Sequence, residues 1–159
     1  MVEKCGKRSL SSGVHVVYVE GFQAGGGVGM EIKYSGPDTQ GSKVIMQSGI
    51  ASSSNVAASR YYHRCNPMNA VASEEFTVCM FRSEVDLTRL PAFGNADTGK
   101  NRLYFIRKGK MPSVNVRDLT QFRKYVPQTP DANYAWVIYG QLKIGIAGSY
   151  TLCITSDDG

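Results

Sequence analysis

Two adjacent carboxylates, Asp157 and Asp158, stand in the run SDDG over residues 156–159. Carboxylate oxygens suit a hard cation such as calcium, and the hydroxyl groups of a sugar could complete the coordination shell of that ion. The same side chains can instead accept hydrogen bonds from nearby backbone N–H groups and so stabilise a turn. Both roles, metal ligand and turn stabiliser, stay open at this level.

The cysteines are a second source of chemistry. There are four of them, Cys5, Cys65, Cys79 and Cys153, and an even number permits two disulfides in any of three connectivities. Cys65 and Cys79 flank a short segment and could close a loop. The alternative is four buried free thiols in a reducing compartment. No apolar signal-peptide segment is visible at the start of the sequence, so targeting does not decide between the compartments.

Other reactive groups favour structural roles. His15 lies in an apolar segment typical of a strand, where a packed or hydrogen-bonded histidine is expected. His63 lies near Cys65 and Cys79, but this spacing fits no standard zinc site and a fourth ligand is missing. No nucleophile and base show a spacing that indicates catalysis, so we expect no enzyme activity.

The glycine run over residues 21–29 invites comparison with phosphate-binding loops. Such loops need a helix directly after them, so that its first N–H groups face the anion. Residues 30–34 instead alternate as a strand. The run therefore predicts the tip of a hairpin between residues 14–20 and 30–34.

The net charge is +5, from 18 Lys and Arg against 13 Asp and Glu. This balance favours acidic partners or simply a solvated surface. Residues 100–110 interleave basic side chains with Tyr104 and Phe105, but strand alternation already explains these aromatics, so we expect no nucleic-acid partner. No apolar run approaches the length of a membrane span, so we expect none.

Alternation with a period of two dominates the chain. It predicts strands at residues 14–20, 30–34, 76–81, 102–107 and across 134–155. Residues 14–20 are apolar on both faces, which predicts a central strand. Residues 114–126 place Val116, Leu119, Phe122 and Tyr125 at helical spacing, before Pro127 and Pro130. This apolar stripe suits the core better than a partner site. We predict one all-β domain over residues 1–159, an antiparallel, jelly-roll-like β-sandwich with one short helix.

Several motifs together resemble the protective-antigen fourteen-kilodalton-type domain. They are AGSYTL over residues 147–152, SDDG over residues 156–159, and Trp136 spaced from Gly140 and Leu142. That family is a β-sandwich found in bacterial toxins, glycosidases and yeast adhesins. In its lectin-like members the two aspartates hold a calcium ion that binds sugar. The resemblance therefore implies calcium at Asp157 and Asp158, glycan recognition and an extracellular or cell-surface location.

The order of the motifs departs from the family. GVHVVYVEG over residues 13–21 and VGMEIKYSGP over residues 28–37 resemble the family's final hairpin, which normally follows the SDDG loop. Here that hairpin comes first, and the strand expected after Gly159 is missing. Residues 1–41 would close one copy, 42–59 would form a linker, and 60–159 would open the next copy. A segment of a tandem array is favoured over a circular permutant.

The resemblance also brings Cys5 and Cys153 together, because the family fold places their segments close to each other. It implies an extracellular, non-catalytic structural or adhesive repeat. Such a repeat would assemble with neighbouring copies by sharing strands in a surface or matrix filament, and glycans are further candidate partners. The alternative is a calcium-dependent, lectin-like module of an adhesin or glycosidase.

Overall fold

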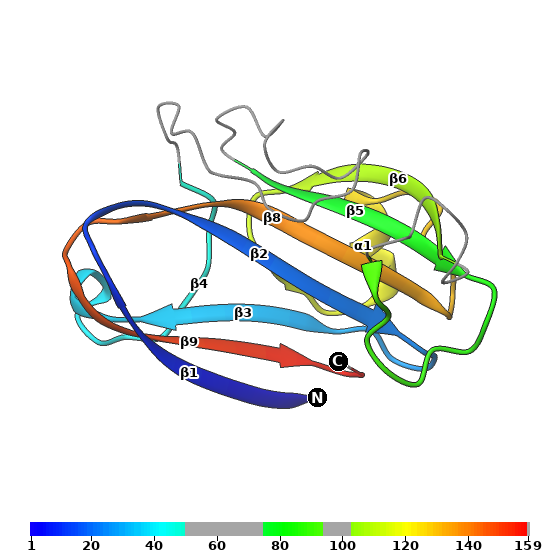
Figure 1. Cartoon of the computed structure of the whole chain (residues 1–159), viewed down its shortest axis with the longest axis horizontal. Helices are drawn as coiled ribbons and strands as arrows, with labels where there is room; N and C mark the ends of the chain where they lie inside the picture. Colours follow the sequence, from blue (N-terminus) through cyan, green and yellow to red (C-terminus); the bar gives the residue numbers. More distant parts are fainter. Residues whose placement is uncertain (50–74, 94–102, 159) are drawn as a thin grey trace.

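The computed structural model describes residues 1–49, 75–93 and 103–158. Two antiparallel sheets face each other as a sandwich (Figure 1). The first sheet has the order β1-β9-β3-β4, with β7 also paired to β3, and the second has the order β2-β8-β5-β6. The elements are β1 (Val2–Leu10), β2 (Gly13–Gln23), β3 (Met30–Ser35), η1 (Pro37–Thr39), β4 (Val44–Ile45), β5 (Phe76–Ser83), β6 (Leu103–Met111), β7 (Asn115–Val116), α1 (Leu119–Tyr125), β8 (Tyr134–Ile144) and β9 (Gly148–Ser156).

The predicted fold class is confirmed, since the described chain forms an all-β sandwich with one short helix, α1. Two strand pairs cross together from one sheet to the other. β1 pairs with β9 up to Leu10 opposite Gly148, and β2 pairs with β8 from Gly13 opposite Ile144. A paired ribbon that turns the corner between two sheets is the arrangement expected of a jelly roll.

The main core lies between the sheets. The first sheet contributes Met30, Ile32 and Tyr150, and the second contributes Trp136 and Ile138 among others. A second apolar cluster lies on the outer face of the second sheet. It joins buried strand residues to two residues of the segment after β5, and its members are Phe22, Cys79, Phe81, Leu87, Phe93, Leu103, Ala135, Val137 and Tyr139. β5 is therefore buried on both faces.

Two expectations about strands are wrong. β2 lies at the edge of its sheet among the described strands, not at the centre. Its two apolar faces arise because one packs on the main core and the other on the outer cluster. β2 and β3 belong to different sheets, so residues 24–29 form an arch between sheets instead of a hairpin tip. In the first sheet, β9 pairs with β1 on one side and with β3 on the other.

The predicted helix is shorter than its apolar stripe. Val116 belongs to β7 and pairs with Met30 of β3, so the helix begins only after it. Asp118 caps the helix by accepting a hydrogen bond from the Gln121 N–H at 2.7 Å. Phe122 is buried and contacts the Trp136 ring edge-on, which confirms the core role of the stripe for this residue.

Part of the expected linker over residues 42–59 is paired with the first sheet and the segment after β6. Residues 44–45 form β4, and Gln47 forms a β-bridge with Ser113. Residues 50–59 lie outside the described part of the chain. Within the described ranges, no helix has both the length and the apolar character needed to cross a membrane.

Candidate functional site

The sheets are built from two halves of the chain that cross-pair. We call residues 1–49 the N-terminal half, residues 75–158 the C-terminal half, and the ladders between them the seam. In the seam, β1 and β3 flank β9 while β2 lies along β8 (Figure 1). By contrast, β5 pairs with β6 and β8 inside the C-terminal half. The named ladder inside the N-terminal half is the short pairing of β3 with β4.

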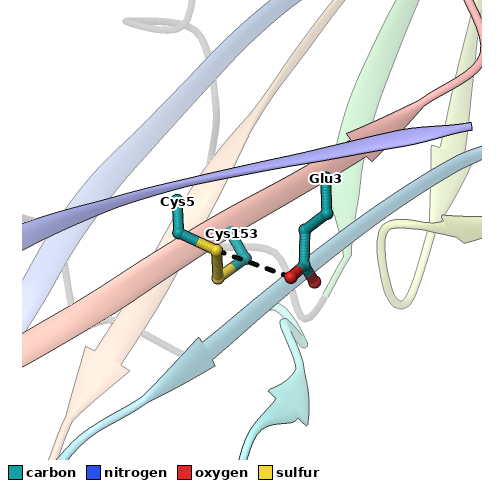
Figure 2. A group of neighbouring side chains, drawn as sticks. All are labelled: Glu3, Cys5 and Cys153. Atoms are coloured by element: carbon teal, nitrogen blue, oxygen red, sulfur yellow. Dashed lines mark hydrogen bonds between the residues drawn. A yellow bond between two sulfur atoms is a disulfide. The ribbon is translucent and has the colours of Figure 1, made fainter.

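A disulfide crosses the seam between Cys5 of β1 and Cys153 of β9, as the resemblance implied. The two cysteines lie directly opposite each other, with their Cα atoms 4.1 Å apart (Figure 2). Cys5 is exposed and Cys153 is buried. Cys79 is also disulfide-bonded, but Cys65 lies outside the described residues, and the predicted pairing of Cys65 with Cys79 lies outside them too.

Glu3 lies beside this disulfide on the same face of β1. Its Oε2 is 3.6 Å from Cys5 Sγ (the dashed line in Figure 2) and 2.9 Å from Lys43 Nζ. A disulfide sulfur has no proton to donate, so the sulfur contact is not a hydrogen bond. Among the described histidines, cysteines, aspartates and glutamates, Glu3, Cys5 and Cys153 form the one group of three side chains close enough to share a metal ion. Metals bind thiolates, and the disulfide removes both of them.

Asp157 and Asp158 clamp the end of β9 to the arch over residues 24–29. Asp158 Oδ2 accepts hydrogen bonds from the backbone N–H groups of Ala24 at 2.8 Å and Gly25 at 3.4 Å. The Asp157 N–H donates to the Gly29 carbonyl at 3.2 Å. Asp157 Oδ1 lies 3.6 Å from the amino group of Met1. These contacts match the turn-stabilising role that the sequence left open.

The arch is also held from inside. Gln23 is 1% exposed, and its side-chain amide donates to the carbonyls of Gly25 at 3.0 Å and Gly27 at 2.6 Å. A Cβ at position 27 would lie 2.9 Å from Asp157 Oδ2, so glycine lets the carboxylate approach the backbone. No sequence pattern points to Gln23, because an isolated glutamine carries no motif.

The aspartates alone do not make a calcium shell. Calcium takes about six to eight oxygen ligands, and Asp158 Oδ2 already accepts two backbone N–H groups. In the ranges that the structure describes, no third carboxylate, histidine or cysteine joins these two residues in a ligand group. The residues present therefore fit a clamp better than a resident calcium ion.

A second polar clamp lies at the opposite end of the seam. Asp38 of η1 accepts a hydrogen bond from the Gly145 N–H in the β8–β9 turn at 3.3 Å. Tyr150 is fully buried, and its hydroxyl donates to the Ile146 carbonyl at 2.6 Å. Burial, followed by the Asp38 carboxylate, raises the pKa of the Tyr150 hydroxyl. The two clamps thus fix the N-terminal half on the C-terminal half at both ends.

Tyr134 lies near the first clamp and is also fully buried. Its hydroxyl has no hydrogen-bond partner among the described residues. Burial is the main cause that raises the pKa of this hydroxyl, the Arg123 guanidinium opposes the shift, and Asp158 and Asp131 add to it. The group therefore stays protonated in the folded protein far into the alkaline range.

The remaining predicted candidates lie elsewhere. His15 Nε2 lies 2.8 Å from the Ser11 carbonyl at the start of β2, so His15 is hydrogen-bonded as expected. His63 lies outside the described residues. Within the basic stretch over residues 100–110, the described residues 103–110 lie in β6, where Lys110 Nζ donates to Thr77 Oγ1 at 2.8 Å. The described candidates, His15 and Lys110, make these contacts away from the seam clamps.

No family model, curated protein or solved structure matches this chain. The geometry of the seam is therefore the basis for the functional argument.

Proposed function

We propose that this chain is an extracellular, non-catalytic structural or adhesive domain that assembles with neighbouring copies by sharing strands. The observation that carries the proposal is the seam. β1, β2 and β3 pair with β8 and β9 of the C-terminal half. A half without its partner would leave these backbone donors and acceptors without ladder bonds, which makes the isolated half unstable.

The partner of a half can come from the same chain or from a neighbouring copy. The contacts of the seam depend on the residues of the two halves, not on whether residues 50–74 join those halves in one molecule. The N-terminal half of one chain can therefore pair with the C-terminal half of a neighbour in the same register. The motif order adds support through the family that the sequence resembles, because in that family it is the order expected where one repeat ends and the next begins.

The disulfide supports the proposed location. The bond between Cys5 and Cys153 joins β1 to β9, and Cys5 is exposed to solvent. Disulfides of this kind persist in oxidising surroundings and are rare where thiols are kept reduced. An exposed disulfide in a structural domain is thus consistent with an extracellular or cell-surface protein.

The alternative function, calcium-dependent glycan recognition, rests on Asp157 and Asp158. Its support is that the Asp157 side chain remains 31% exposed beside Asp158 at one end of the sandwich. Against it stands the incomplete ligand set among the described residues. Filament or matrix assembly is therefore the first proposal, and the lectin-like role is the second.

Sedimentation velocity of the whole chain tests the first proposal. The protein is refolded under oxidising conditions at a series of concentrations, so that exchange competes with closure within one chain. We expect monomers at the lowest concentration, with dimers and larger species appearing as concentration rises. A monomer at every concentration would refute assembly between copies.

A further inference from the structure

We infer that, in the assembled state, the Cys5–Cys153 disulfide forms between chains and links neighbouring copies covalently. The surface that receives the neighbour is the pair of β8 and β9, and its occupant is the N-terminal half of a second copy. The inference rests on the proposed function, because it assumes that halves are exchanged. It adds a chemical link that assembly alone does not require.

The register of β1 makes the link specific. Cys5 lies opposite Cys153 in a ladder that runs from Val2 opposite Ser156 to Leu10 opposite Gly148. A slip by one residue would move the Cys5 side chain to the other face of the sheet. The sulfurs therefore meet only when β1 is fully in register, whichever chain supplies it.

β1 is also the strand that most needs the bond. Every residue from Val2 to Ser9 is exposed, and only Leu10 packs against the core. Among the described strands, β1 has one neighbour, β9. A strand that buries so little apolar surface is held weakly by its ladder alone. The disulfide is thus the main bond that holds β1 on β9, whether β1 belongs to the same chain as β9 or to a neighbouring copy.

The bond can form with a small-molecule disulfide such as oxidised glutathione. The exposed Cys5 thiolate of one chain attacks a glutathione sulfur, forms a mixed disulfide and expels one glutathione thiolate. The Cys153 thiolate of the neighbouring chain, which lies opposite Cys5 once the strands pair, then attacks the Cys5 sulfur and expels the second glutathione thiolate. Two protein thiols are oxidised, and one glutathione disulfide is reduced to two thiols. The exposure of Cys5 leaves one side of the pair accessible to this exchange.

Two full-length variants test the inference, C5S and C153S. Neither can form the bond within one chain, yet a mixture places Cys5 of the second variant opposite Cys153 of the first. The variants are mixed in denaturant, refolded together with glutathione buffer, and separated on a non-reducing gel. We expect a covalent dimer in the mixture, with peptide mapping that shows Cys5 joined to Cys153, and none of this peptide in either variant alone.

A register control separates exchange from random collision. The control chain carries C5S, C153S and S149C, so its new cysteine is exposed on β9 but lies opposite Ser9 in the ladder. Aligned thiols react far faster than freely colliding ones, so the control should give at least about tenfold less dimer with C153S. Equal yields would overturn the inference.

The outcomes also separate the two claims. If the native chain associates by sedimentation but the mixture yields no Cys5–Cys153 crosslink, the covalent link is refuted and strand sharing stands. If the native chain stays monomeric at every concentration, the proposed function itself is refuted.

Discussion

Trp136 of β8 lies directly opposite Gly21 of β2, and its indole ring fills the space where a side chain at position 21 would stand. A Cβ at Gly21 would lie 2.4 Å from Cζ2 of the indole. The indole N–H donates to Met30 Sδ at 3.2 Å, so the single tryptophan contacts two strands of the N-terminal half. The seam is therefore a packed core junction as well as a set of ladders.

The G21A substitution should destabilise the fold by about 1–3 kcal/mol, because the added methyl group overpacks the indole. Gly6 of β1 gives the matched control, since nothing lies within 4 Å of a Cβ built there. G6A should leave the free energy of unfolding unchanged or slightly higher. Urea unfolding followed by Trp136 fluorescence checks both values, and equal losses for the two variants would contradict the described packing.

The D158A substitution should cost about 1–2 kcal/mol, because it removes the acceptor for the Ala24 and Gly25 N–H groups. The control is D131A, since Asp131 forms an exposed ion pair with Arg123 at 2.8 Å. Surface pairs of this kind contribute about 1 kcal/mol or less. Thermal unfolding compares the two variants, and a smaller loss for D158A than for D131A would argue against the clamp.

Added calcium should leave the melting temperature of the native chain unchanged, because the aspartates act as a clamp in the first proposal. A ligand that binds only the folded state raises the melting temperature, and the rise grows with the logarithm of the ratio of ligand concentration to Kd. A clear rise with calcium that is abolished by D157A would instead favour the lectin-like function. Magnesium at the same concentration serves as the control for ionic strength.

Loss of the Cys5–Cys153 bond should lower the free energy of unfolding by about 2–5 kcal/mol. We expect the C5S/C153S variant to lose protection first in β1, which buries almost no apolar surface, while β5 and β8 remain protected. Hydrogen exchange read by mass spectrometry resolves these strands. Uniform loss of protection across all of them would show that β1 is not the strand held by the bond.

Stability should fall as pH rises above about 10, the ordinary pKa of tyrosine in the unfolded chain. Burial raises the pKa of Tyr134 and Tyr150 in the folded state, so the unfolded chain releases these protons first and is favoured at high pH. The Y134F substitution should weaken this dependence. Urea unfolding between about pH 8 and about pH 11 measures the slope.

Y134F should also be neutral or stabilising near neutral pH, because the Tyr134 hydroxyl is buried and has no partner in the described residues. A loss of more than about 1 kcal/mol would mean that the hydroxyl makes a bond that the structure does not show.

Local pattern foretold much of the fold. Alternation around Val78 and Ile138 reflects side chains that point to opposite faces of a sheet, and both residues lie in the predicted strands. The order of the strands within each sheet was harder to predict. Residues 14–20 look central because both faces of β2 meet apolar clusters, and nothing local reveals that its outer edge has no described neighbour.

The sequence also predicted only part of the candidate site, because local patterns do not record contacts between distant residues. The aspartates were found by type, and the pairing of Cys5 with Cys153 came from resemblance, since four cysteines alone permit three connectivities. Gln23 and Asp38 act through single hydrogen bonds to distant backbone, which no spacing in the sequence records. The glycine run over residues 24–29 predicts a hairpin although it forms an arch, because glycine favours both kinds of turn.

Complementation between two broken chains tests the central claim, that halves are exchangeable, most directly. I32D places a charge in the core from the N-terminal half, and I138D does so from the C-terminal half; these positions are 3% and 0% exposed. Each variant alone should be unfolded. When I32D and I138D are mixed and refolded together, the unsubstituted C-terminal half of the first can pair with the unsubstituted N-terminal half of the second. A mixture of I32D and M30D cannot do this, because both substitutions lie in the N-terminal half. Trp136 fluorescence and circular dichroism should recover in the first mixture only, and no recovery there would contradict strand sharing between copies.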